Sequence, residues 1–327
     1  MAYTEIDDSS AYFQTTLYSG TGSSQSITNT GNSDLQPDFV WIKARSDAGG
    51  HALYDSVRGT TKRLASHNNA AEGTVSGGVT AFGADGFTVG NDGDVNSASS
   101  IVSWNWKKTA DAGFDIVSYS GNNSTNRQIS HSLSAKPDMM IVKCRQSGLW
   151  KIYHSSLGAT KYLVLSDTAA AVDNNSTWND TEPTSSNFTL GDDGNVNETG
   201  ETYINYLFAE KKGYSKFGSY TGNGNADGTF VYLGFKPAFI ITKYSSGTGQ
   251  NWQMYDNKRN PHNFVDTVLF PNGNADEEAY DKYDFLSNGF KARSTSTGTN
   301  VSGGTYIYMA FAENPFVTST GVPSTAR

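Results

Sequence analysis

The sequence predicts an all-β protein made of three tandem antiparallel β-sandwich domains of the jelly-roll or lectin-like kind. The first observation is an internal repeat, because Pro37–Lys43 returns as Pro137–Lys143 and again as Pro237–Lys243. The second is composition: turn-forming Gly, Ser, Asn and Asp are abundant and aromatic residues make up 13% of the 327 residues. That mixture is typical of short strands joined by tight turns. The third is that no segment sustains a helical period of apolar residues.

The repeat keeps one register well beyond this block. Tyr18-Ser19-Gly20 becomes Tyr119-Ser120-Gly121 and then Tyr220-Thr221-Gly222, and each copy closes on an alternating aromatic strand, at 101–107, 202–211 and 305–313. We therefore expect three domains: 1–112 with a short N-terminal tail, 113–215, and 216–327 with a short C-terminal tail. Each is large enough to bury a core without disulfides or metals. The period leaves open whether they form independent beads or tightly docked sandwiches.

Local patterns predict the elements of the first copy in order. β-Branched and aromatic residues predict a strand over 12–18, and the nearly continuous apolar run 38–43 after Pro37 predicts a strand covered on both faces. Further strands are expected at 51–55 and from residue 64, separated by a turn at 58–60. Asp85-Gly86 predicts a hairpin over 82–89. The segment 101–106 closes the copy, and Pro37, Pro137 and Pro237 are expected to open equivalent strands.

Charge and composition argue against several classes of partner and location. The net charge is −8, which argues against a nucleic-acid partner because phosphate binding needs a basic surface. The first ten residues lack an apolar core and no stretch approaches 18 apolar residues, so we expect neither a signal peptide nor membrane insertion. The single Cys144 cannot form an internal disulfide and is expected to be a small buried hydrophobe.

Two acidic loops resemble the start of a calcium loop. Residues 92–96 and 193–197 offer Asp or Asn oxygens at alternate positions. Neither loop has the glycine and glutamate that a calcium loop needs later, and the third copy has lost the acids. We predict hydrogen-bonded turns here, with no metal and no cofactor.

No constellation of catalytic residues repeats. Asp55 and Asp256 align, but His154 takes that position in the second copy and no second acid accompanies them. The sequence also lacks a nucleophile elbow and a phosphate-binding loop in a strand–helix setting. We predict no catalytic residues and no enzymatic activity.

Aromatic residues are the remaining site candidates. Trp150 and Trp252 share one repeat position with His51, and Trp104 and Trp106 lie two apart on a strand, so they point to one face. Two interpretations stay open: these rings form a ligand surface, such as a sugar platform, or they fill the core or the contact between copies.

Four strings and the opening of the chain resemble a known repeat. These are residues 38–43, 53–59, 85–90, 104–107 and the opening 6–14. They resemble the repeat of roughly 100 residues in virion proteins of marine tailed phages, including cyanophages, over essentially the whole chain. The resemblance implies a place on the capsid surface, on a tail fibre or on another tail part, and brings no catalytic residues.

The expected function is that of a non-enzymatic structural protein on the surface of a phage virion, as a capsid knob, a decoration protein or a short adhesin. Copying a domain multiplies weak contacts, which suits display or adhesion. A tail fibre or other receptor-binding tail protein is the first alternative, and a bacterial carbohydrate-binding lectin or glycosidase is the second. The expected partners are other capsid or tail proteins and a host surface glycan, with homo-oligomers in a particle assembled in the host cytoplasm.

Overall fold

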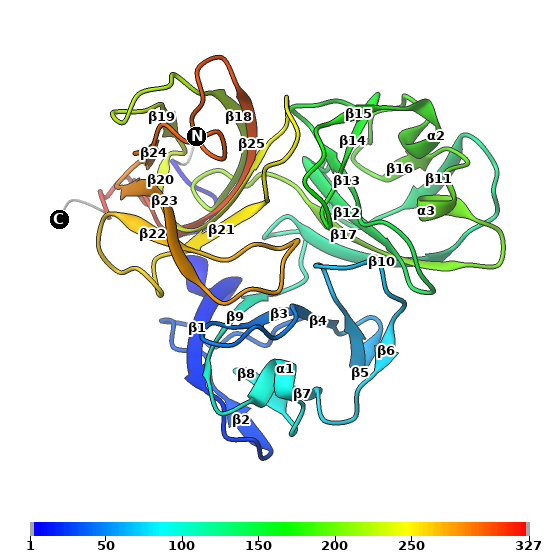
Figure 1. The fold of residues 1–327 in the computed structure, drawn as a ribbon, viewed down its shortest axis with the longest axis horizontal. Helices are drawn as coiled ribbons and strands as arrows, with labels where there is room; N and C mark the ends of the chain where they lie inside the picture. Colours follow the sequence, from blue (N-terminus) through cyan, green and yellow to red (C-terminus); the bar gives the residue numbers. More distant parts are fainter. Residues whose placement is uncertain (1–2, 325–327) are drawn as a thin grey trace.

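The computed structural model describes residues 3–324 and is nearly all β, which confirms the predicted class. Figure 1 shows three lobes around a common centre, one for each copy. We call the copies repeat 1 (1–112), repeat 2 (113–215) and repeat 3 (216–327). Within residues 3–324 no helix is long and apolar enough to span a membrane. The helical turns are η1 (Ser9–Ala11), α1 (Gly93–Asn96), α2 (Asn175–Trp178) and α3 (Gly194–Asn197).

Repeat 1 consists of an inner sheet, which faces the centre of the molecule, and a smaller outer sheet. The inner order is β1-β9-β3-β4-β5-β6 and the outer order is β2-β8-β7. The strands are β1 (Phe13–Ser19), β2 (Gln25–Ile27), β3 (Phe39–Ala44), β4 (Ala52–Asp55), β5 (Gly59–Leu64), β6 (Gly73–Thr74), β7 (Val79–Gly83), β8 (Gly86–Val89) and β9 (Ser100–Trp106).

Repeat 2 uses the same plan, with the inner order β10-β17-β12-β13-β14-β15 and the outer pair β11-β16. Its strands are β10 (Phe114–Ser120), β11 (Arg127–Ser130), β12 (Met139–Cys144), β13 (Lys151–His154), β14 (Lys161–Val164), β15 (Val172–Asp173), β16 (Asn187–Leu190) and β17 (Thr202–Phe208).

Repeat 3 has the inner order β18-β25-β20-β21 and the outer order β19-β24-β23-β22. In all three inner sheets the first strand pairs with the closing strand, which pairs with the strand of the Pro–Lys block. The strands are β18 (Ser215–Thr221), β19 (Phe230–Tyr232), β20 (Phe235–Tyr244), β21 (Gln253–Asp256), β22 (Val265–Val268), β23 (Glu278–Leu286), β24 (Gly289–Ala292) and β25 (Thr305–Pro315).

Each inner sheet is covered on both faces, as the apolar run 38–43 predicts. All six residues of β3 are buried. Side chains alternate along a strand, so Phe39 and Trp41 enter a core at the centre of the molecule. Val40 and Ile42 enter a separate core beneath the outer sheet. Repeats 2 and 3 have outer cores of their own.

The central core decides between beads and docked sandwiches. It contains buried residues of all three inner sheets in one cluster, so the repeats are docked face to face rather than strung as beads. Its large members include Trp41, Trp104, Trp106, Trp150, Tyr206, Phe208, Phe239, Trp252, Met309 and Phe311.

Three local expectations are wrong. The strand expected to start at residue 64 is instead β5, which ends there. Strand β20 begins at Phe235, so Pro237 lies inside the strand, at a shift of register between β20 and β25. Proline lacks an N–H and is tolerated where pairing is irregular. The turn after β4 occupies residues 56–58, and Gly59, with φ of 92°, already begins β5.

The repeats meet at three interfaces, which we call seams. Residues 107–113 connect repeat 1 to repeat 2, and residues 209–214 connect repeat 2 to repeat 3. Repeats 3 and 1 are distant in sequence and meet only through noncovalent contacts. The stacked rings of Phe13 and Phe311, with centroids 5.1 Å apart, are one such contact. We call this third interface the closing seam.

Candidate functional site

The predicted ligand aromatics are all buried. Trp104, Trp106, Trp150 and Trp252 are each at most 1% exposed and belong to the central core. A sugar needs an exposed ring face, so these four residues cannot form a sugar platform. The sugar-platform interpretation is therefore wrong for these residues, and the rings pack the contact between repeats.

The position shared by His51, Trp150 and Trp252 joins each repeat to a neighbour. In every case a ring nitrogen lies within hydrogen-bonding distance of a backbone carbonyl in that neighbour. The carbonyl belongs to the residue after Leu64, Leu163 or Leu269, which occupy one repeat position. The pairs are Trp150 Nε1 to Ala65 O (3.0 Å), Trp252 Nε1 to Val164 O (2.9 Å) and His51 Nε2 to Phe270 O (3.0 Å).

His51 can replace tryptophan at this position because it is held in one tautomer. Trp41 Nε1 donates to His51 Nδ1 at 2.8 Å, so the ring proton sits on Nε2 and is donated to Phe270. Burial moves the pKa of His51 well below its ordinary value. The ring is therefore neutral, as a buried imidazole without a carboxylate partner should be.

The repeat position of the aligned acids forms a second ring of contacts, which runs the other way round the centre. Each member of the position shared by Asp55, His154 and Asp256 meets the closing strand of the next repeat. The pairs are Tyr206 Oη to Asp55 Oδ2 (2.8 Å), His154 Nε2 to Tyr308 O (3.1 Å) and Trp104 Nε1 to Asp256 Oδ2 (3.2 Å).

The charge of each buried acid is balanced within its own repeat. Arg58 Nε lies 2.5 Å from Asp55 Oδ2, and Arg259 Nε lies 2.6 Å from Asp256 Oδ2. All four side chains are fully buried. A carboxylate fully committed to an arginine and a neighbouring repeat has no access to a substrate.

Sequence reasoning missed these arginines, although a signal was present. Copies with an acid at the aligned position have arginine three residues later, whereas His154 is followed by Leu157. Acid and base thus change together, because a buried charge without its partner is strongly destabilising.

A third set of contacts crosses the seams near the ends of the inner strands. Arg145 and Glu72 form a two-pronged ion pair at 2.8 and 2.9 Å, as do Arg45 and Glu277 at 2.7 and 2.9 Å. The equivalent place between repeats 2 and 3 has only the hydrogen bond from Ala171 N to Ser245 O, at 2.9 Å. Glu72, Ala171 and Glu277 lie outside the strands, so loops make these contacts.

The lysines that end the Pro–Lys blocks are also structural. Lys43, Lys143 and Lys243 are buried, and each ammonium donates to backbone carbonyls. Burial lowers the pKa of each of the three to about 8.

The acidic loops are hydrogen-bonded turns, as predicted. Asp92 and Asp193 each accept a hydrogen bond from the backbone two residues on, at 3.2 and 2.8 Å, and each precedes a single helical turn. Within residues 3–324 no three His, Cys, Asp or Glu side chains gather as metal ligands. The constant feature of the loop is instead a buried asparagine, whose amide joins two loops in every repeat: Asn96, Asn197 and Asn300.

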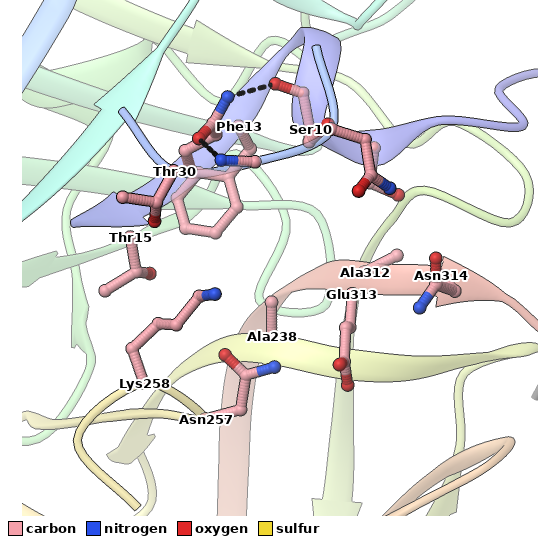
Figure 2. Close-up of a pocket in the computed structure, with 14 residues that line it drawn as sticks. Ser10, Phe13, Thr15, Thr30, Ala238, Asn257, Lys258, Ala312, Glu313 and Asn314 are labelled. Atoms are coloured by element: carbon pink, nitrogen blue, oxygen red, sulfur yellow. Dashed lines mark hydrogen bonds between the residues drawn. The ribbon is translucent and has the colours of Figure 1, made fainter. Parts of the chain in front are cut away.

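Solvent reaches a polar cavity of about 260 Å³ at the closing seam (Figure 2). Repeat 1 contributes Phe13 and Thr15, and repeat 3 contributes Asn257, Lys258 and Glu313. Their side chains converge on one space between strand β1 above and strands β20 and β25 below in the view.

A second, more apolar hollow of about 420 Å³ lies beside an exposed aromatic patch. Tyr3, Tyr232 and Phe316 line it and are 62%, 56% and 38% exposed. We call these three residues the aromatic patch. Such grouped exposed rings are typical of interaction surfaces.

Comparison with known proteins gives one match. A family model described as "Domain of unknown function (DUF7483)" matches residues 8–315. The chain belongs to this family. The single match spans all three repeats of the DUF7483 chain, in keeping with their shared core. No curated protein and no solved structure matches the chain.

Proposed function

We propose that this chain is a non-enzymatic structural protein displayed on the surface of a phage particle. The observation that supports this most is the use of the aligned polar positions. Asp55, His154 and Asp256, which would be the first catalytic candidates, are buried and join the repeats. The sequence resemblance to phage virion proteins supplies the location.

The aromatic patch is the surface through which we propose that the chain attaches to another virion protein. The patch is apolar, and Lys212 and Lys216 also line the hollow beside it. A stable contact buries about 800 Å² per partner, so the patch would form the centre of a larger interface. Buried aromatic residues at such a centre usually contribute most of the affinity.

Purified particles of the phage that encodes the chain provide the test. We expect antibodies against the protein to label intact particles, and Tyr232→Ser with Phe316→Ser to reduce the protein recovered with them at least tenfold. Tyr280→Ser is the matched control, because that ring is 48% exposed and lies outside the patch. Particles that lack the protein, or that retain the patch variant fully, would contradict the proposal.

The lectin or glycosidase alternative is tested on the isolated protein. Asp55 and Asp256 are buried against arginines, so we expect no hydrolysis of host polysaccharides. Hydrolysis by the protein that is lost in folded Asp55→Asn or Asp256→Asn protein would refute the non-enzymatic proposal.

A further inference from the structure

The cavity at the closing seam exists because repeat 3 departs from the other two. In repeats 1 and 2 the carboxylates of Asp38 and Asp138 fill the equivalent place and accept backbone N–H groups of the linkers, those of Lys108 and Glu210, at 2.8 Å. Repeat 3 has Ala238 there. The closing seam also has no linker crossing it. The space that an aspartate side chain and a linker fill at the other two seams is therefore open.

The walls of this cavity carry polar atoms without partners. Ser9 Oγ, Thr15 Oγ1 and Asn257 Oδ1 are buried and form no hydrogen bond within the described chain. Ser9 and Thr15 are only 2% and 4% exposed. In repeat 1 the residue equivalent to Asn257 is Ser56, whose hydroxyl donates to Asp38 at 2.7 Å. Buried polar atoms are nearly always satisfied, so these three indicate a polar occupant.

The charges at the cavity favour an occupant with a carboxylate. The exposed Lys258 lies at its edge, where repeats 1 and 2 have Val57 and Ser156. Figure 2 shows its ammonium directed into the space, opposite Thr15. Glu313 on the far wall is neutralised by Lys236 at 2.6 Å. Repeat 3 has thus lost an internal carboxylate and gained an ammonium.

Size and chemistry together define the ligand. The volume of about 260 Å³ is many times the roughly 10–15 Å³ that one water needs, so the cavity has room for a single sugar ring. Hydroxyls of a sugar can both donate to Asn257 Oδ1 and accept from Ser9 and Thr15. The Phe13 ring forms an apolar wall.

We propose that the closing-seam cavity binds one uronic acid unit, with its carboxylate in the place left by Ala238 and beside Lys258. The ligand would contact both repeat 1 and repeat 3 and so fasten the noncovalent seam. This proposal concerns the isolated protein and stands whether or not the chain is part of a particle.

Calorimetric titration of the full chain with D-glucuronate, D-galacturonate, D-mannuronate and D-glucose tests it. We expect at least one uronate to bind with a Kd of about 1 mM or tighter, at least tenfold tighter than glucose. Ala238→Asp restores the internal carboxylate and should abolish binding. Lys258→Met should weaken uronate binding at least fivefold without changing the melting temperature. Lys107→Met, a change at an exposed lysine away from the cavity, should leave uronate binding unchanged.

Three results would overturn the proposal. They are no binding of any uronate, equal affinity for uronates and glucose, and unchanged uronate affinity in folded Ala238→Asp or Lys258→Met protein. If Ala238→Asp fails to fold, the Lys258→Met result decides alone, because this side chain lies at the exposed edge of the cavity.

Discussion

Replacing Phe311 with alanine tests whether the three repeats unfold as one unit. Phe311 is 1% exposed and lies in the central core. Its ring centroid is 5.1 Å from that of Phe13, 5.7 Å from that of Trp106 and 6.0 Å from that of Phe208. One side chain of repeat 3 therefore supports repeats 1 and 2 as well.

The structure sets the size of the effect. Truncating a buried phenylalanine costs about 3–5 kcal/mol. Unfolding entropy is about 2.1 cal/mol/K per residue, so for a single unit of 327 residues this loss lowers the melting temperature by about 4–7 °C. If a repeat of roughly 100 residues unfolded alone, the same loss would lower its own transition by about 15–25 °C.

Differential scanning calorimetry distinguishes the two cases. We expect one transition in both proteins, with equal calorimetric and van't Hoff enthalpies, shifted by the smaller amount in Phe311→Ala. Phe230→Ala is the control, since that ring is 43% exposed and its loss should change stability by about 0.5 kcal/mol or less. A separate early transition, or an unshifted one, would refute the shared-core reasoning.

Three further predictions concern buried polar groups. Asp55→Asn should cost about 3–5 kcal/mol in urea unfolding, because it breaks a buried ion pair and leaves Arg58 with Glu72, at 3.1 Å, as its remaining carboxylate partner. A loss below about 1 kcal/mol would contradict this. Burial lowers the pKa of His154 to about 4 in the folded protein, from an ordinary 6.5. As the pH falls from 6.5 to 4, this histidine is therefore protonated in the unfolded chain before it is protonated in the folded one. The free energy of unfolding should fall over that range by up to about 1.4 kcal/mol per pH unit. His154→Gln should reduce that slope. Lys43, Lys143 and Lys243 each have a pKa of about 8 when folded, below the ordinary 10.5. The free energy of unfolding should therefore rise from pH 8 towards pH 10, and Lys243→Met should reduce that rise by about a third. An equal rise in the variant would contradict this.

Much of the fold could be predicted because its signals are local. The run 38–43 has a nearly unbroken apolar pattern, and a strand with that pattern must be covered on both faces. Asp85-Gly86 specifies a tight turn by its backbone preferences alone. The Asx turns at Asp92 and Asp193 likewise depend on residues two positions apart, at 3.2 and 2.8 Å.

The candidate site could be predicted only in part. The alignment groups Asp55 with Asp256 and Trp150 with Trp252, but it does not say what each position contacts. Tyr206 lies 151 residues from Asp55, and no local pattern connects the two. The arginine three residues after each acid was visible, yet its meaning depends on burial.

The sequence by itself therefore determined the repeat, the strand class and the position of most turns, since these depend on side-chain alternation and backbone preference over a few residues. Only the tertiary structure decided that the three inner sheets share one core, that the aligned tryptophans and acids join neighbouring repeats, and that a cavity remains at the closing seam. The physical reason is that an apolar strand face is equally stable against another sheet of its own repeat or against a neighbouring repeat. The choice is made by how three copies pack around one centre, which no single copy encodes.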